Sequence, residues 1–197
     1  MSNVTSSAPD SPASAPAQGR RDFLLYATAT TAAVGTAFAL WPFIDSMNPA
    51  ADVLAQAKTE VDLAPVVVGQ RITAQWRGKP IFIAHRTAAE IAAARSVDVA
   101  TLRDPQTDAD RVVDPDWLIV IGICTHLGCI PLGQKASDPR GQWGGWFCPC
   151  HGSQYDTSGR IRKGPAPLDL HIPHYDLDVA KAHLVIGAKG GPRNAGR

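Results

Sequence analysis

The sequence has no excess of charge of either sign. It contains 19 lysines and arginines against 18 aspartates and glutamates, which gives a formal net charge of +1, and no long run of one sign occurs. Proteins that bind nucleic acid or another polyanion usually carry a concentrated basic surface. The composition gives no reason to expect such a partner, and we predict that the chain does not bind nucleic acid.

Cysteine is scarce and tightly confined. The four cysteines all lie in two short stretches, CTHLGC starting at Cys124 and CPCHGS starting at Cys148. The same stretches contain two of the six histidines, His126 and His151. Cysteines that are clustered and interleaved with histidines indicate a metal site before they indicate a framework of disulfides.

Charge is also missing from Phe23 to Ile44, a run of 22 residues. A helix of that length is about 33 Å long, which is enough to cross the hydrocarbon core of a membrane. Arg20 and Arg21 precede the run, so the N-terminus is expected to stay in the cytoplasm while the C-terminus crosses. We therefore predict a single membrane helix over residues 20–44.

Other interpretations of this run fit less well. A cleaved signal peptide could end at AFA, residues 37–39, but the apolar residues continue through Ile44. A helix buried in a soluble protein is disfavoured because the segment has no polar face. RRDFLL, which contains Arg20 and Arg21, resembles the twin-arginine export signal. That route is known for carrying folded proteins, as a protein whose cofactor is inserted in the cytoplasm would require.

The segments on either side of the membrane helix show no regular pattern. Residues 1–19 are mostly serine, alanine and proline with one acid and no base, so we predict a disordered tail. Residues 45–58 lack the apolarity of a membrane span and the alternation of a strand. Pro49 also opposes any continuation of the helix. We predict that residues 45–58 form a flexible tether.

Residues 59–197 have the pattern of an antiparallel β domain. RITAQWR and PIFIAHR alternate around Gly78 and Lys79, which indicates a hairpin. WLIVIGIC has the character of a buried strand, and it leads directly into Cys124. The predicted fold class is all-β, with a metal-binding subdomain inserted at about residues 122–168.

Three local features complete this pattern. Thr87 and Glu90 have the spacing of a capping box that begins a short helix. Residues 131–143, between the two cysteine loops, are expected to form a surface excursion. The basic segment Arg160–Gly164 is expected to be a solvated strand end.

Four cysteines and two histidines are candidate ligands for the metal, and a site with four protein ligands would use only four of these six side chains. A zinc site could use any four, but Cys148-x-Cys150 is too tight to chelate one ion comfortably. A four-cysteine site of the plant type would need Cys-x4-Cys-x2-Cys, and the second gap here is wrong. Two plain disulfides would leave both histidines unexplained. His85, His171, His174 and His183 lie outside the two motifs, and we expect no redox role for them.

The remaining interpretation rests on a resemblance. CTHLGC, CPCHGS with Tyr155 two residues further on, and GPAP at Gly164–Pro167 resemble the motifs of Rieske iron–sulfur proteins. With the twin-arginine span and the tether, the resemblance covers nearly the whole chain. It is similar to the Rieske subunits of bacterial cytochrome bc complexes, the ubiquinol–cytochrome c reductases.

The resemblance implies one 2Fe–2S cluster of the Rieske type. In this family pattern Cys124 and Cys148 hold one iron, and His126 and His151 hold the other. The remaining cysteines, Cys129 and Cys150, would form a disulfide that joins the two loops. An exported domain can keep such a bond because its compartment is oxidising.

The resemblance also implies roles for the residues around the cluster. Ser153 would donate a hydrogen bond to a bridging sulfide, and Tyr155 would donate one to the sulfur of Cys124. Hydrogen-bond donors to the sulfur atoms of a cluster raise its reduction potential. The apolar tip that docks on cytochrome b would consist of Leu127, Gly128 and Pro165. Leu127 would also shield the cluster.

The implied function is electron transfer within a quinol-oxidising complex. His151, with His126 as its companion, would accept a hydrogen bond from ubiquinol and then take a proton together with the electron. The electron would pass to a c-type cytochrome by movement of the tethered domain, which contributes to proton-motive force. The implied location is the bacterial cytoplasmic membrane, with the cluster domain in the periplasm. The chain alone would be an electron carrier, and the assembly would be the enzyme.

Three alternative functions compete with this one. A Rieske ferredoxin or oxygenase component would lack the second cysteine pair, the membrane span and the tether. A plastoquinol-oxidising relative of the bc complex is disfavoured by MNPAADV and RRDFLLYAT, which resemble the ubiquinol branch. A purely structural zinc domain is the fourth possibility.

Overall fold

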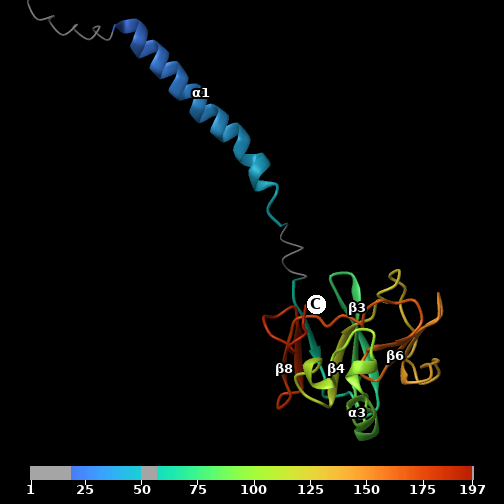
Figure 1. Ribbon diagram of the computed structural model, residues 1–197. Helices are drawn as coiled ribbons and strands as arrows, with labels where there is room; N and C mark the ends of the chain where they lie inside the picture. Colours follow the sequence, from blue (N-terminus) through green and yellow to red (C-terminus); the bar gives the residue numbers. More distant parts are fainter. Residues whose placement is uncertain (1–18, 50–56, 197) are drawn as a thin grey trace, which may run out of the picture. The chain divides into compact units, whose positions relative to one another are not determined.

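The computed structural model describes residues 19–49 and 57–196, and these belong to two separate units (Figure 1). The chain divides after Ala50. The first unit contains a long helix, and the second contains all the strands. Nearly all of the predicted tail, and the part of the predicted tether from 50 to 56, lie outside the described residues.

Helix α1 spans Arg20–Asp45, one residue further than predicted. By length and composition it is the one helix of the described residues that could cross a membrane. Its polar side chains are satisfied within the helix, because four threonine hydroxyls each donate to the carbonyl four residues earlier, at 2.7–2.8 Å: Thr28, Thr30, Thr31 and Thr36. A helix whose hydroxyls bond its own backbone leaves few polar groups that need water.

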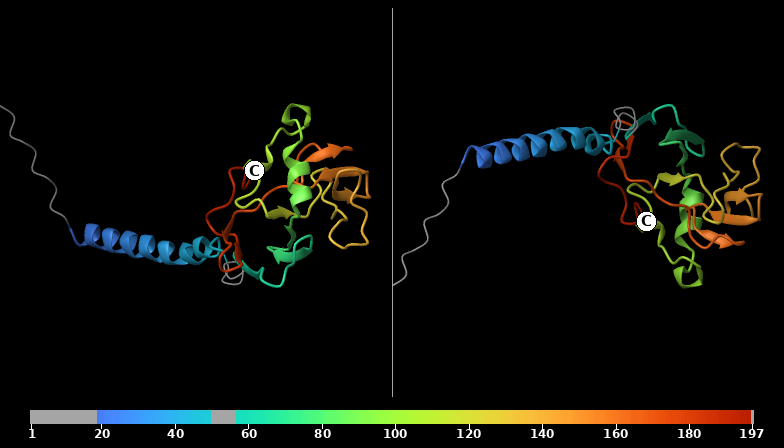
Figure 2. Two further views of the ribbon diagram at one scale, coloured as in Figure 1. Left: turned by 90° about the horizontal axis from the view of Figure 1, so that it is seen from below. Right: turned by 90° about the horizontal axis from the view of Figure 1, so that it is seen from above.

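The second unit contains three antiparallel sheets of three strands each. The first has the order β1 (Thr59–Asp62), β9 (His183–Ile186), β8 (Tyr175–Asp178); the second β2 (Arg71–Trp76), β3 (Lys79–His85), β4 (Trp117–Ile121); the third β5 (Gly144–Cys148), β6 (Ser153–Asp156), β7 (Ile161–Lys163). Figures 1 and 2 place the sheet with β3 and β4 between the other two. The predicted all-β class with one N-terminal helix is confirmed.

The predicted hairpin is confirmed at β2 and β3. The strands pair with Trp76 opposite Lys79, so the two turn residues are Arg77 and Gly78. Both have positive φ, 49° and 73°, as a two-residue turn that follows the twist of the strands requires. The turn therefore lies one residue earlier than the sequence suggested.

The core lies where the middle sheet packs between its neighbours. Strand β4 is buried along Trp117–Val120, as predicted for the strand that leads into Cys124. Phe82 of β3 stacks on Trp146 of β5, with ring centroids 6.0 Å apart and an interplanar angle of 15°. This stacked pair joins the middle sheet to the sheet that carries the second cysteine loop.

Helix α3 (Ala88–Arg95) begins with the predicted capping box, formed by Thr87 and Glu90. Glu90 also binds Arg71 at 2.9 Å. Burial alone would raise the pKa of Glu90, but hydrogen bonds from the Thr87 amide and the Arg71 guanidinium outweigh burial and hold the pKa below its usual value. Arg71 in turn donates to three carbonyls near the cysteine loops, those of Gly133, Gly144 and Gly145.

The expectation for Arg160–Gly164 is wrong at its first residue. Arg160 is only 1% exposed and pairs with Asp156 at 2.8 Å. Its guanidinium also donates to the carbonyl oxygens of Gln106 and Ala94. A charged side chain is stable in the interior when it is both paired and hydrogen-bonded. These partners lie 54 and 66 residues away in sequence, so the local basic pattern gave no sign of them.

Candidate metal centre

Two tight loops of similar construction form the centre. The first follows β4, and the amide of Gly128 donates to the carbonyl of Cys124 at 3.0 Å. The second joins β5 to β6, and the amide of Gly152 donates to the carbonyl of Cys148, also at 3.0 Å. Both glycines have positive φ, 82° and 78°, which favours glycine at the point where each loop turns back. Each loop therefore presents its first cysteine at its base.

The two loops bring two histidine rings together. The centroids of His126 and His151 lie 4.6 Å apart with the rings nearly perpendicular. The Nδ1 atom of His126 is buried and has no hydrogen-bond partner among the described residues. A buried ring nitrogen without a partner is costly, and coordination of a metal would satisfy it.

The base of the site contains two buried sulfur atoms. Cys124 and Cys148 are 2% and 1% exposed, and their thiols are close enough for each to shift the pKa of the other. Burial raises the pKa of Cys148 to about 12. Burial would also raise the pKa of Cys124, but hydrogen bonds from the Tyr155 hydroxyl and the His126 amide reverse the shift and lower it. The environment of Cys124 is therefore built to favour negative charge on its sulfur.

Cys129 and Cys150 lie beside this base, and all four cysteines carry free thiols in the structure. The sulfur atoms of Cys129, Cys148 and Cys150 lie within 4.8 Å of one another. Contact with the Cys150 thiol raises the pKa of Cys129. These three sulfurs alone could chelate an ion, but such a site would omit Cys124 and leave the His126 nitrogen unsatisfied. The predicted Cys129–Cys150 disulfide stays a prediction.

Two hydroxyl groups approach the sulfur of Cys124. The Tyr155 hydroxyl donates to the Sγ atom at 3.2 Å, and the Ser153 hydroxyl also helps to lower the pKa of this thiol. Tyr155 and Ser153 are both fully buried. Burial raises the pKa of Tyr155, so its hydroxyl keeps its proton and remains a donor. The structure thus places both predicted donors, Tyr155 and Ser153, beside the thiol of Cys124.

The sequence did not single out Thr125, which links three parts of the centre. Its amide donates to the Tyr155 oxygen at 3.3 Å, and its hydroxyl donates to the carbonyl of Leu168 at 2.6 Å. In the sequence, the one indication of this role is that Thr125 directly follows Cys124.

The rim of the centre is apolar and exposed. Leu127 is 69% exposed, and Gly128 and Pro165 are also exposed, as expected for the predicted docking residues. The sequence did not identify two further exposed apolar residues of these loops, Ile130 and Leu168. The donor set, two buried sulfurs below two imidazoles with an unsatisfied ring nitrogen, fits an iron–sulfur cluster better than a single zinc ion.

Comparison with known proteins decides between an iron–sulfur cluster and a zinc ion. Residues 69–176 match the model of the Rieske [2Fe-2S] domain, and residues 11–50 match that of the ubiquinol–cytochrome c reductase Fe-S subunit TAT signal. The ubiquinol-cytochrome c reductase iron-sulfur subunit of Rhodospirillum rubrum is 65% identical over 79% of this chain and 85% of its own length. The chain belongs to this family of Rieske subunits.

Further relatives agree. The mitochondrial Rieske subunit of the cytochrome b-c1 complex of Saccharomyces cerevisiae is 56% identical over 84% of this chain and 74% of its own length. A chain of a solved hyperthermophilic respiratory complex III superposes with a TM-score of 0.50 at 26% identity, covering 81% of this chain and 97% of that chain. The predicted family, fold class and Rieske 2Fe–2S cofactor are confirmed, and the Rieske subunit acts in electron transfer within a quinol-oxidising oxidoreductase.

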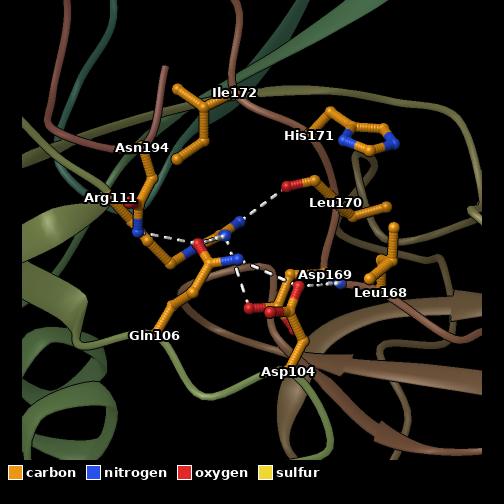
Figure 3. A pocket seen from close by; sticks show the side chains of 9 residues that line it. All are labelled: Asp104, Gln106, Arg111, Leu168, Asp169, Leu170, His171, Ile172 and Asn194. Carbon is orange, nitrogen blue, oxygen red and sulfur yellow. Dashed lines mark hydrogen bonds and ion pairs between the residues drawn. The ribbon is translucent and has the colours of Figure 1, made fainter. Parts of the chain in front are cut away.

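A small cavity of about 30 Å³ is lined by Gln106, Arg111 and Asp169, among others (Figure 3). The buried guanidinium of Arg111 donates to the carbonyls of Ser158 and Leu170 and to Gln106. It also pairs with Asp169 at 3.4 Å. The carboxylate of Asp169 accepts a hydrogen bond from the amide of Ile161 at 2.8 Å. Arg111 therefore ties the segment after the third sheet to the chain that precedes β4.

Asp169 makes the stability of the Rieske domain depend on pH. Burial raises the pKa of Asp169 to about 7, and the nearby Asp104 and Asp156 add to the effect against the opposing charge of Arg111. The folded protein thus keeps a proton that the unfolded chain, with a pKa of about 3.9, has lost. This group's contribution to the free energy of unfolding is therefore present at about pH 4 and falls as pH rises to about 7.

Asp169→Asn should remove this dependence, because the amide oxygen still accepts from Ile161 but does not ionise. The free energy of unfolding of the variant, relative to the parent, should rise between pH 5 and pH 7.5, by up to about 1.4 kcal/mol per pH unit. Urea denaturation of the full-length protein in detergent measures it, with exposed Asp176→Asn as the matched control. A constant difference between variant and parent across this range would contradict the raised pKa.

Proposed function

We propose that the chain takes one electron from ubiquinol at cytochrome b and delivers it to a c-type cytochrome. The observation that carries the proposal is the joint placement of Cys124, Cys148, His126 and His151 in one site of a Rieske subunit. The helix α1 of membrane length supports a place in a membrane complex. The comparison proteins named as cytochrome b-c1 and complex III components support these partners.

We assign the cluster ligands to the two loop bases and the two imidazoles. Cys124 and Cys148 would hold one iron because their thiols are buried and close enough for each to shift the pKa of the other. His126 and His151 would hold the other, which gives the buried Nδ1 atom of His126 a partner. When bound, the Rieske cluster supplies a one-electron carrier with a potential of about −150 to +300 mV, because two neutral imidazoles replace two thiolates.

The protein's own groups then favour the added electron. Tyr155 donates to the sulfur of Cys124, and Ser153, which helps to lower the pKa of that thiol, would donate to a sulfide of the cluster. Both donors stabilise negative charge on sulfur. Both are buried, so water does not compete for these hydrogen bonds. The site is therefore suited to the upper part of the Rieske range, which a quinol oxidant requires.

His151 is exposed and is the group that we assign to quinol. Its ring nitrogen that does not bind iron can accept a hydrogen bond from a quinol hydroxyl and then hold the proton. His126 is the companion, partly buried beside it. The exposed Leu127, Gly128 and Pro165 would exclude water and seat the domain on cytochrome b.

The close approach of Cys129 and Cys150 supports the proposed disulfide between them. Such a bond would join the two loops at a point outside the buried sulfurs. It would be stable in the periplasm, where we place the domain, and not in the cytoplasm. Arg20 and Arg21 at the start of α1 support a cytoplasmic N-terminus and export through the twin-arginine route.

Three assignments can be tested together on the purified full-length protein: the high potential of the cluster, its histidine ligands and the Cys129–Cys150 disulfide. Ascorbate should produce the electron paramagnetic resonance spectrum of a Rieske cluster. The midpoint potential should be constant at low pH and fall at alkaline pH, with a slope that approaches about −59 mV per unit. Alkylation without reductant should label none of the four cysteines.

Each arm of this experiment has a contrary outcome. Failure of ascorbate to reduce the cluster would exclude the high-potential class. A potential that stays constant at high pH would contradict the histidine ligands. Labelling of Cys129 and Cys150 alone would show that the disulfide is absent and would leave the cluster assignment intact.

Removal of either hydroxyl should lower the midpoint potential without loss of the cluster. Tyr155→Phe and Ser153→Ala each delete a donor, so more negative charge stays on the sulfur and reduction becomes less favourable. Redox titration measures the change. Tyr175→Phe is the matched control, because this fully buried tyrosine belongs to the β8 sheet and contacts the Val113 amide. Equal potentials in all the proteins would remove both hydroxyls from the role that we assign.

We also propose that the domain moves on its tether between cytochrome b and the c-type cytochrome. Electron-transfer rates fall steeply with distance, so one fixed position serves two partners poorly. Of the predicted tether 45–58, Asp45 ends α1 and the Asn48 amide still donates to the carbonyl of Asp45. The remaining ten residues, 49–58, would reach about 33 Å if extended. The composition, small alanines around Asn48-Pro49, agrees with a hinge.

Proline substitution at Ala50, Ala51 and Asp52 should stiffen the tether and slow quinol-to-cytochrome turnover. The potential and the assembly of the complex should be unchanged, and glycine at the same three positions is the control. Turnover assays on membranes with equal amounts of assembled complex measure the effect. Normal turnover with a demonstrably stiffened tether would refute domain movement.

A further inference from the structure

A short loop closes the metal centre on the side of Ser153. Residues 164–168 connect β7 towards β8, outside the strands of the described domain. The Ala166 amide donates to the Ser153 hydroxyl oxygen at 3.2 Å, and Ala166 is fully buried. Pro165 and Pro167 have no N–H group, so this loop has few backbone donors with which to hold itself in place.

The loop lies unusually close to the second cysteine loop. Gly164 has φ of 101°, and a Cβ atom at this position would lie 2.5 Å from the Cα of Ser153. The backbone of residue 164 is thus in direct contact with the backbone of residue 153. A small outward movement of the loop would therefore lengthen the Ala166–Ser153 hydrogen bond.

One side chain from a distant segment holds this loop. The Nη1 atom of Arg103 donates to the carbonyl of Gly164 at 2.7 Å and to that of Ala166 at 2.6 Å. These two carbonyls flank Pro165, so a single nitrogen fixes the backbone on both sides of the loop's tip. Arg103 lies 61 and 63 residues from its partners and between the short helices η1 (Val99–Thr101) and η2 (Asp108–Asp110).

The loop contact determines how Ser153 can act. A serine hydroxyl has one hydrogen to donate and two acceptor positions. With the Ala166 amide on one acceptor position, the Ser153 hydrogen is directed away from the loop and towards the sulfur of Cys124, whose pKa this hydroxyl helps to lower. Without the amide, the hydroxyl can rotate, and its hydrogen can leave the sulfur.

We propose that Arg103 is a positioning residue for the redox centre, which acts by clamping the loop 164–168 so that Ala166 orients the Ser153 hydroxyl. The proposal rests on the proposed cluster function only for its effect on potential. The clamp itself is a property of the chain. Arg103 is exposed and does not touch the cysteines or histidines of the centre, so its effect must pass through the loop.

Two variants separate the clamp from the charge of Arg103. Arg103→Lys keeps the positive charge, but its stem is about one bond shorter and its ammonium lacks the planar pair of N–H groups. Arg103→Gln loses both charge and reach. Arg77→Gln is the control, because Arg77 is exposed and stacks on Trp76 at the β2–β3 turn.

The first measurement is hydrogen exchange of the full-length protein, which requires no cluster. Both Arg103 variants should increase exchange of the Ala166 amide by about tenfold, because the loop opens more often. Exchange in the β3 peptide should be unchanged, which shows that the domain is folded. Unchanged exchange at Ala166 in both variants would overturn the clamp.

The second measurement is the midpoint potential in a double-mutant cycle. Arg103→Lys and Arg103→Gln should both shift the potential in the direction of Ser153→Ala, and Arg103→Gln should add no shift in the Ser153→Ala background. A normal potential in Arg103→Lys with a shift in Arg103→Gln would assign the effect to charge and overturn the proposal. Additive shifts of Arg103→Gln and Ser153→Ala would do the same. Absence of a Rieske spectrum from the parent protein would instead refute the proposed function and leave the exchange test valid.

Discussion

Donation from arginine side chains to backbone carbonyls is the constraint on which the rest of this domain depends. The loops around the metal centre pair little with other strands, so their carbonyls need other donors. The buried Arg71 donates to three carbonyls near the cysteine loops. The buried Arg111 and Arg160 each donate to two carbonyls elsewhere in the domain. A guanidinium suits this task because it presents five donors in a fixed plane. Arg103 performs the same task at the exposed edge.

These arginines explain how an irregular site can be rigid. The buried guanidinium groups are held by carboxylates, Arg71 by Glu90, Arg111 by Asp169 and Arg160 by Asp156. Removing one partner of such a pair leaves a buried charge uncompensated, which is strongly destabilising. At the Arg111–Asp169 pair, burial raises the pKa of Asp169 more than the charge of Arg111 lowers it. The loops are therefore fixed by a network whose members support one another.

The features that the sequence predicted well are those set by neighbouring residues. The charge-free run of α1, the capping box at Thr87 and the strand before Cys124 depend on local patterns, and the structure contains all three. The cysteine and histidine motifs indicated the family and its cofactor, and the comparisons confirm both. What sequence reasoning missed depends on distant contacts. Arg160 was expected to be solvated, and Arg103 and Thr125 were not singled out, because most of their partners lie 30 to 66 residues away.

The division of the centre into buried and exposed groups suits the proposed function. A carrier that moves between two partners must keep its potential while its surroundings change. The two proposed donors to the cluster sulfurs, Tyr155 and Ser153, are fully buried, so docking on either partner leaves them in place. His151 and the apolar rim at Leu127 are exposed and can meet each partner in turn. Under this proposal the buried network fixes the electronic properties of the centre, and the exposed edge is left free for recognition and for the proton.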